Sequence, residues 1–434
     1  MMKKRIFIFE FVSGGGFNKV NIPISLFCEG FGMLRSITQD FKLIGFEIYT
    51  LLDYRIHHLS RILTVDNFIK IKRKDNYLEQ FKILVKECEY AFIIAPETNN
   101  ILFKLTKIVQ NYNKIVLSTN LEGIKIGTSK INTYKFFLKN KILTPKTFLI
   151  PLKKNNLDIE FIIQKFYKLE QPIIIKPEDG VGAESIYYFE TKKQIENFFK
   201  HFKYKIEAGR NYVLQEFIDG RDLSISLINT TNSLNLETER PYILSINSQY
   251  INIKSSNYKS EYLGGITPTE NHQKESLELI KILDKIDFSQ FSGYFGIDLI
   301  KSTNSRFYFI EINPRLTTSY IGLRNAIDRN PAELILDSKL AITRTKSVKL
   351  QYYSLFIRIE LVYLKSKLKN KRKVELIHKL INLIPELVTP PISLSKSNQF
   401  TCFIATKTED LDSSKERLQE IYKILEEFNF NIVR

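Results

Sequence analysis

Three side chains with oxygen ligands lie close together in one segment in the second half of the chain. Asp298 stands in an apolar run, and Glu311 and Asn313 follow in a second run rich in β-branched and aromatic residues. Side chains alternate along a strand, so a hairpin of the two runs would present Glu311 and Asn313 on one face. Ile310 and Ile312 would lie on the other face. Two carboxylates and an amide suit Mg²⁺ or Mn²⁺, which complete their coordination with substrate phosphates.

The alternative is a surface hairpin whose polar face is in water. That alternative does not explain why the second run ends in Asn-Pro-Arg. The planar guanidinium of Arg315 is suited to hold a carboxylate or an acyl phosphate just beyond the predicted metal ligands. A surface salt bridge is the other reading of this arginine.

A lysine and a glycine-containing loop form a second group. Lys176 ends a predicted buried strand over residues 172–176, and Gly180 and Gly182 lie in the loop that follows. An ammonium binds phosphate as a point charge, and glycines let backbone N–H groups approach the phosphate oxygens. These residues therefore predict a phosphate site. The alternative is a strand-end lysine that reaches solvent beside an ordinary turn.

A third group lies where one predicted strand ends and an Asp-Gly turn leads into the next. The strand end reads Gln215, Glu216, Phe217 and Ile218, and Asp222 follows the turn. Backbone groups of such a hinge can bind the edge of an adenine, and the carboxylate can bind ribose hydroxyls. The alternative is a strand, a turn and a strand with solvated acids.

Strands and helices alternate over residues 1–118, which predicts an open α/β domain with a parallel sheet. The expected strands are residues 5–12, 43–51, 90–95 and 114–117, and the expected helices are residues 25–40, 77–87 and 99–110. The Ser-Gly-Gly-Gly segment after the first strand matches neither GxGxxG nor GxxxxGK[ST]. We favour a turn that lets a substrate or a partner domain approach the backbone over a phosphate-binding loop.

The remaining chain predicts a helix over residues 127–140, a compact small lobe over about 144–218 and a mostly antiparallel large lobe over about 219–344. A small α/β appendage is expected over 345–434. The predicted fold class is therefore α/β combined with α+β. Expected helices are residues 157–169, 192–200, 272–286, 330–341, 376–384 and 412–427, and expected strands include 148–150, 185–189, 212–218, 222–227, 352–361, 400–406 and 430–433.

The composition is that of a globular protein. The 434 residues are 44% hydrophobic and 26% charged, with a net charge of +17 that suits anionic ligands such as nucleotides. Three scattered cysteines predict a reducing compartment without a zinc cluster. No apolar run is long enough for a membrane helix, and the apolar N-terminus fits a first strand better than a signal peptide. We therefore expect a cytoplasmic protein without membrane contacts.

A nucleic-acid-binding module is the alternative that the positive charge suggests. Residues 365–373 hold six basic residues in nine, but few aromatic residues are interleaved with them. Such a cluster more often marks a solvated helix face or a surface that attracts nucleotides, so we expect no nucleic-acid partner.

In their order along the chain, these groups resemble the ATP-grasp superfamily over about residues 119–340. The matching residues are Lys130, Lys176 with its glycine loop, the hinge, Asp298 and the Glu-Ile-Asn-Pro-Arg run from Glu311 to Arg315. The segments FEFVSGGG and EINPRLTTSYIGL are further similar to the ATP-grasp group that includes tyramine–glutamate ligase of methanofuran biosynthesis. The resemblance implies a pre-ATP-grasp domain over 1–118, a two-lobed ATP-grasp domain over 119–344 and the appendage over 345–434.

The resemblance also implies a role for each group. ATP would lie between the lobes, with Lys130 and Lys176 at its phosphates. A flexible lid with Gly180, Gly182 and Ser185 would cover the phosphates, and Gln215, Glu216, Phe217 and Ile218 would contact adenine. Asp222 would bind ribose, and Asp298, Glu311 and Asn313 would bind Mg²⁺ (or Mn²⁺). Arg315 would face an acyl phosphate, with Thr317, Thr318 and Ser319 on the acceptor side.

The implied reaction joins a small-molecule carboxylic acid to an amine through an acyl phosphate. The most specific expectation for the two substrates is glutamate and an aromatic amine such as tyramine. The alternatives are a carboxylase-type enzyme that makes carboxyphosphate from bicarbonate and a fold that binds ATP without turnover. A homo-oligomer is compatible with the sequence. One departure is the Arg that many relatives carry near the position of Gly296, for which Arg324 or Arg210 could substitute.

Overall fold

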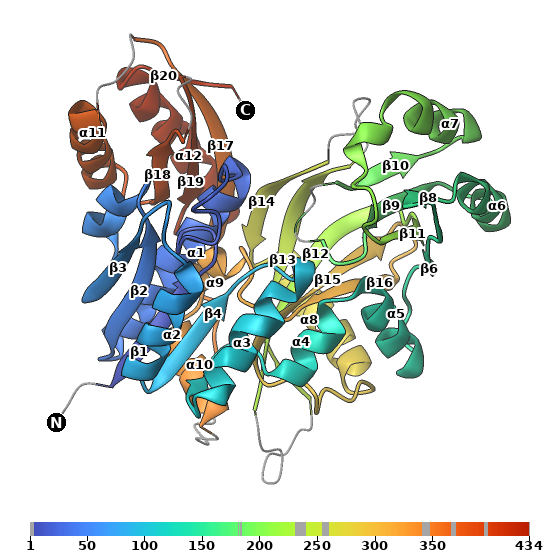
Figure 1. The fold of residues 1–434 in the computed structure, drawn as a ribbon, viewed down its shortest axis with the longest axis horizontal. Helices are drawn as coiled ribbons and strands as arrows, with labels where there is room; N and C mark the ends of the chain where they lie inside the picture. The colour runs from blue at the N-terminus through green and yellow to red at the C-terminus, as the bar shows by residue number, and fades with distance from the viewer. Residues whose placement is uncertain are drawn as a thin grey trace.

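The computed structural model describes residues 4–180, 182, 185–230, 240–253, 260–340, 348–365, 370–394 and 398–433. The elements form an N-terminal sheet, a small lobe and one long sheet that carries most of the remaining chain (Figure 1). In Figure 1 the blue N-terminal sheet lies beside the red C-terminal part, and the green small lobe lies on the opposite side of the molecule. The predicted combination of α/β and α+β architecture is confirmed.

The N-terminal sheet is parallel and has the strand order β3-β2-β1-β4-β5. Its central strand is apolar along nearly its whole length because helices cover both faces of such a sheet. The predicted parallel α/β unit is confirmed, although β3 was not predicted. The elements are β1 Arg5–Glu10, α1 Ile24–Leu43, β2 Glu47–Asp53, η1 His57–Ile62, β3 Asn67–Ile71, α2 Tyr77–Glu87, β4 Tyr90–Ile94, η2 Thr98–Asn100, α3 Ile101–Asn111 and β5 Ile115–Val116.

The small lobe is built on an antiparallel sheet of order β10-β9-β11-β6. Apolar residues of the sheet and of two helices form one common core. This arrangement confirms the compact α+β lobe that the sequence predicts. Its elements are β6 Thr147–Leu149, β7 Leu152–Lys153, β8 Asn156–Leu157, α6 Ile159–Leu169, β9 Ile173–Pro177, β10 Tyr187–Phe189, α7 Lys192–His201, η3 Lys203–Lys205 and β11 Tyr212–Glu216.

The long sheet has the order β16-β15-β12-β13-β14-β17-β19-β18, and β20 also pairs with β17. Its first part comprises β12 Gly220–Asn229, β13 Tyr242–Asn252, β14 Glu261–Thr267, β15 Gly293–Ser302 and β16 Phe307–Asn313. Its second part comprises β17 Ser354–Tyr363, β18 Leu387–Ile392, β19 Gln399–Ala405 and β20 Phe430–Ile432. Because β14 pairs with β17, the sheet is continuous across the predicted boundary between residues 344 and 345.

Seven further helices accompany the long sheet in the described part of the chain. They are α4 Leu121–Gly127, α5 Lys130–Lys139, α8 His272–Leu283, α9 Tyr320–Ala326, α10 Pro331–Lys339, α11 Asn370–Leu383 and α12 Leu411–Glu427. Helix α4 was not predicted. The helix predicted over residues 127–140 is confirmed as α5, but it begins three residues later, at Lys130. Ser129 is the reason, since its side chain accepts a hydrogen bond from the backbone N–H of Asn132 and begins a new helix. No helix in the described ranges is long and apolar enough to span a bilayer.

Helix α1 joins the N-terminal sheet to the long sheet. It packs against β1 on one side and against α9, α10, β18 and β19 on the other. The carboxylate of Asp40 near its C-terminus accepts hydrogen bonds from the Arg324 guanidinium (2.7 Å) and the Tyr320 hydroxyl (2.8 Å) of α9. One turn earlier, Arg35 donates to the backbone carbonyl of Leu387 (2.5 Å). These polar contacts fix the N-terminal unit against the long sheet and helix α9.

The stability of this junction can be tested at Asp40, whose side chain is only 4% exposed. Asp40→Ala leaves the Arg324 guanidinium buried without its carboxylate, so we expect the free energy of unfolding to fall by about 3 kcal/mol. Urea unfolding followed by circular dichroism measures the loss. Asp412→Ala is the matched control, because the Asp412 side chain is 87% exposed beside Lys415. A loss at Asp40 no larger than the loss at Asp412 would contradict the structural role of the junction.

Candidate active site

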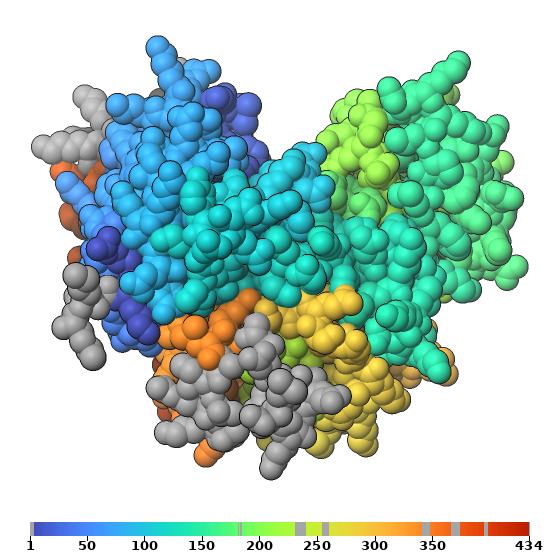
Figure 2. All heavy atoms as spheres, turned by 60° about the horizontal axis from the view of Figure 1, so that its bottom comes forward, coloured from blue at the N-terminus to red at the C-terminus, as the bar shows by residue number. Residues whose placement is uncertain are grey.

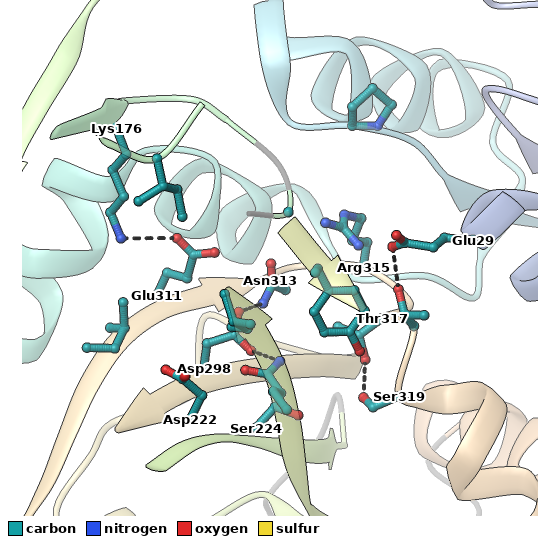
Figure 3. Close-up of a pocket in the computed structure, with 18 of the residues that line it drawn as sticks. Glu29, Lys176, Asp222, Ser224, Asp298, Glu311, Asn313, Arg315, Thr317 and Ser319 are labelled. Atoms are coloured by element: carbon teal, nitrogen blue, oxygen red, sulfur yellow. Dashed lines mark hydrogen bonds and ion pairs between the residues drawn. The ribbon is translucent and has the colours of Figure 1, made fainter. Parts of the chain in front are cut away.

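Most of the site residues predicted from the sequence line a cavity where the N-terminal unit, the small lobe and the long sheet meet. Figure 2 shows the molecule hollowed between the green small lobe and the blue N-terminal unit. Side chains from β9 and β11 of the small lobe, from β12, β13, β15 and β16 of the long sheet, and from α1 line this cavity. Figure 3 shows Lys176 and Glu311 toward one side of it and Arg315 and Glu29 toward the other.

The predicted hairpin is confirmed as β15 and β16, with Asp298 directly opposite Glu311. A bulge follows this pair. Leu299 pairs with Phe309, so Ile310, which lies between Phe309 and Glu311, has no direct pairing partner on β15. Ile310 therefore lines the cavity, whereas Ile312 is buried in the core. The prediction that both isoleucines lie on the face opposite Glu311 was wrong, because regular alternation fails at the bulge.

Asp298 lies among amide donors. The side-chain amide of Asn313 donates to Asp298 Oδ2 (2.8 Å), and that of Gln249 donates to Asp298 Oδ1 (3.1 Å). Burial and the neighbouring carboxylate of Glu311 nevertheless raise the pKa of Asp298 to about 7. A buried acid next to another acid is stabilised in its charged form by a cation, so this position suits a metal ion.

The donor set fits Mg²⁺. Asp298, Glu311 and Asn313 offer oxygen ligands from adjacent strands, and all three line the cavity. Within the described ranges, no group of three or more His, Cys, Asp or Glu side chains is arranged to hold a metal. A hard cation bound by two carboxylates and an amide needs further oxygens, which nucleotide phosphates supply.

Two lysines lie beside Glu311. The Nζ atoms of Lys130 and Lys176 are 3.4 Å and 3.7 Å from Glu311 Oε2. Burial favours a raised pKa for Glu311, but the two lysines hold it below its ordinary value. For Lys176, burial has the opposite effect and lowers the pKa to about 8, and the nearby Lys130 lowers it further. Lys176 lines the cavity and Lys130 does not, so a phosphate group in the cavity would give Lys176 a second anionic partner.

The alternation of β9 positions Lys176. Ile173 and Ile175 point into the core of the small lobe, whereas Ile174 and Lys176 line the cavity. The strand therefore presents one buried lysine to the site while its other face packs against α7.

The glycine loop after β9 contacts the same site in part. Gly182 lines the cavity, and Lys130 Nζ donates to the carbonyl of Gly180 (2.9 Å). Ser185 does not belong to the cavity lining. Residues 181, 183 and 184 of the predicted lid lie outside the described residues, so the lid stays a prediction.

The predicted hinge lies at the wall between the two lobes. Gln215, Glu216 and Ile218 line the cavity, as does Asp222 at the start of β12. Burial, together with Asp219, raises the pKa of Asp222 to about 6.

Local contacts hold the hinge in place. Gln215 donates to the Thr147 hydroxyl (2.8 Å), and Glu216 accepts from the Lys146 backbone (2.9 Å). Phe217 does not line the cavity. Its ring lies against Tyr188, with the ring centroids 4.8 Å apart. The nucleotide-binding role of this hinge stays a prediction.

The N-terminal unit holds Arg315. The Nε atom of Arg315 donates to Glu97 Oε1 (3.0 Å), and its Nη1 atom donates to the carbonyl of Leu316 (3.1 Å). Burial works against the charged guanidinium, but Glu97 keeps the pKa of Arg315 above its ordinary value. Glu97 follows β4 of the N-terminal unit. This arginine is therefore oriented by a residue more than two hundred positions away in the chain. The sequence around Arg315 carries no signal of that partner.

Neither suggested substitute takes the place of the arginine that the family resemblance implies near Gly296. A Cβ atom at Gly296 would lie 2.7 Å from Cγ2 of Thr317, so a larger side chain does not fit there. Arg324 is paired with Asp40, and Arg210 is paired with Asp179 (3.1 Å). Neither arginine lines the cavity, so both suggested substitutes were wrong.

Thr317, Thr318 and Ser319 line the cavity beyond Arg315, on the side nearest the N-terminal unit. Two acids that the sequence reading did not select, Glu10 and Glu29, line it as well. Each acid interrupts an apolar strand or helix, which is the argument that selected Asp298. The same criterion applied to the N-terminal domain would have found both.

Comparison with known proteins agrees with this geometry. A pre ATP-grasp 3 domain matches residues 46–124, and an ATP-grasp domain matches residues 128–319. The chain is also 30% identical over 342 residues to tyramine–L-glutamate ligase of Methanocaldococcus jannaschii, which covers 77% of this chain and 89% of that protein. The chain belongs to the ATP-grasp family. It is a ligase of this family and joins a carboxylate to an amine with ATP.

Solved structures share the fold of this ATP-grasp ligase. An L-amino acid ligase from Bacillus licheniformis superposes with a TM-score of 0.64 and 13% identity, covering 100% of this chain and 99% of that chain. The biotin carboxylase domain of the Hydrogenobacter thermophilus 2-oxoglutarate carboxylase superposes with a TM-score of 0.68 and 11% identity, covering 100% and 91%. At these identities the structures support the fold alone.

Replacing Glu311 tests the metal assignment. Glu311→Ala removes one carboxylate ligand and the anionic partner of both lysines, so we expect Mg²⁺-dependent ADP release to fall by about 100-fold or more. The circular dichroism spectrum should stay that of the wild type. Glu160→Ala, at a side chain that is 88% exposed on α6, is the control and should keep full activity. Unchanged turnover in Glu311→Ala would remove the metal assignment.

Proposed function

We propose that this ATP-grasp ligase activates a small-molecule carboxylic acid as an acyl phosphate and transfers the acyl group to a primary amine. The observation that carries the proposal is the position of Arg315. It lies two residues beyond Asn313, in a cavity that continues from the predicted nucleotide side to the acids of the N-terminal unit. A guanidinium held at one edge by Glu97 keeps other N–H groups for an oxyanion in the cavity.

Each part of the site has a role in this proposal. Asp298, Glu311 and Asn313 would hold Mg²⁺, which neutralises phosphate charge when it is bound. Lys176 would bind the phosphates, with Lys130 next to it. The hinge at Gln215, Glu216 and Ile218 would contact adenine, and Asp222 would bind the ribose.

The reaction needs no nucleophile from the protein. The carboxylate of the acid attacks the γ-phosphorus of ATP, and ADP leaves with the bonding electron pair. The amine then attacks the acyl carbon, phosphate leaves, and one proton is released from the nitrogen as the amide forms. Arg315 would stabilise the negative charge on the acyl phosphate, and the chain otherwise contributes orientation and the exclusion of water.

Glutamate and tyramine are the first substrate pair to test. The support is the identity to tyramine–L-glutamate ligase, which extends over most of both chains. Such a reaction would belong to the biosynthesis of a methanofuran-type cofactor. Two acids on the side of the cavity away from the lysines also favour a substrate with an amino group over bicarbonate.

A coupled ADP-release screen of amino acids against amines tests the proposal. We expect ADP release to require Mg²⁺, one acid and one amine together, with glutamate and tyramine among the pairs assayed. The amide product is identified by mass spectrometry. ADP release that depends on bicarbonate and not on an amine would contradict the proposal and favour the carboxylase-type reaction.

A further inference from the structure

Glu29 occupies an unusual position on α1. Its neighbours Phe27, Cys28 and Gly30 are fully or almost fully buried, yet the Glu29 side chain is 17% exposed and lines the cavity. Leu26 and Met33 lie three positions before and four positions after it, so the three side chains share one face of the helix. All three line the same cavity. The helix therefore presents one carboxylate between apolar side chains to the site.

The contacts of Glu29 connect it to the segment that carries Arg315. The hydroxyl of Thr318 donates to Glu29 Oε2 (3.1 Å), and Arg358 Nη1 lies 3.6 Å from Glu29 Oε1. The hydrogen bond from Thr318 thus fixes Glu29 in place. Glu29 lines the part of the cavity beyond Arg315 (Figure 3).

Glu10 is a second carboxylate on the same wall. It ends β1 and accepts hydrogen bonds from the backbone N–H groups of Val12 (2.9 Å) and Ser13 (2.7 Å). A Cβ atom at Gly30 would lie 2.7 Å from Glu10 Cδ, so the glycine next to Glu29 lets the carboxyl of Glu10 contact α1. Burial raises the pKa of Glu10 to about 7, since its hydrogen bonds and the nearby Arg315 compensate the burial only in part.

The chemistry of this wall suits one type of group. Two carboxylates attract a cation, while Phe17, Leu26 and Met33 offer apolar surface next to them. The aromatic ring of Tyr262 lines the same cavity, and aromatic faces attract ammonium groups. An organic ammonium with an apolar body satisfies both features.

We propose that Glu29, supported by Glu10, binds the ammonium group of a substrate on the α1 side of the cavity. This assignment rests on the proposed ligase function and makes α1 of the N-terminal unit a determinant of substrate specificity. The ammonium can belong to the amine that attacks the acyl phosphate or to an α-amino acid that is activated. The chemistry of recognition is the same in both cases, and the experiment separates them.

The experiment compares two reactions in the wild type and in Glu29→Gln. In the first reaction hydroxylamine replaces the amine, and hydroxamate formation from glutamate or from glutarate reports activation of the acid alone. In the second reaction tyramine is the acceptor and the amide is measured. Gln keeps an oxygen that can accept from Thr318 and removes only the charge. Glu160→Gln on α6 is the matched control, and Glu29→Asp should restore part of any loss.

We expect Glu29→Gln to raise either the KM for tyramine or the KM for glutamate by about 10- to 100-fold, as the loss of a charge-assisted hydrogen bond does. The KM for ATP should stay unchanged. A raised KM for tyramine with normal hydroxamate formation assigns the ammonium to the amine. A raised KM for glutamate but not for glutarate assigns it to the amino acid. Either result supports the proposal.

Three outcomes overturn the assignment. Unchanged KM values in an active Glu29→Gln enzyme overturn it and leave the ligase function intact. An equal loss of activity with glutamate, with glutarate and with tyramine shows that Glu29 only supports the fold. A wild-type enzyme that forms no hydroxamate from any acid overturns the ligase function together with the inference that rests on it.

Discussion

The site depends on the burial of two carboxylates at adjacent positions of a hairpin. Asp298 and Glu311 face each other across β15 and β16, where burial and mutual repulsion disfavour two negative charges. The structure compensates by bringing cations from other units: Lys176 from the small lobe, Lys130 from α5 and Arg315 from the segment after β16. The requirement to balance this charge explains why three parts of the chain converge on one cavity.

The features that the sequence predicts correctly are those with a local cause. The apolar run Ile-Ile-Ile predicts the strand that carries Lys176, and the hairpin follows from two β-rich runs joined by a turn. The bulge at Ile310, the pairing of Glu97 with Arg315 and the continuity of β14 with β17 have no local cause. They depend on contacts between residues far apart in the sequence, which no short window of residues encodes.

The N-terminal unit is a structural part of the site and not only a neighbour of it. It supplies Glu97 to orient Arg315, and it supplies Glu10 and Glu29 as the acidic wall of the cavity. Asp40 fixes α1 against α9, so the wall is held in register with the segment that carries Arg315.

The central claim is that the acid is activated by transfer of the γ-phosphoryl group in this cavity. An acid substrate labelled with heavy oxygen in its carboxylate tests it most directly, with phosphate and nucleotide analysed by mass spectrometry after turnover. The account predicts that one labelled oxygen per turnover appears in the released inorganic phosphate, with ADP unlabelled. Label in AMP, or phosphate that carries no label while the amide forms, would contradict the acyl phosphate.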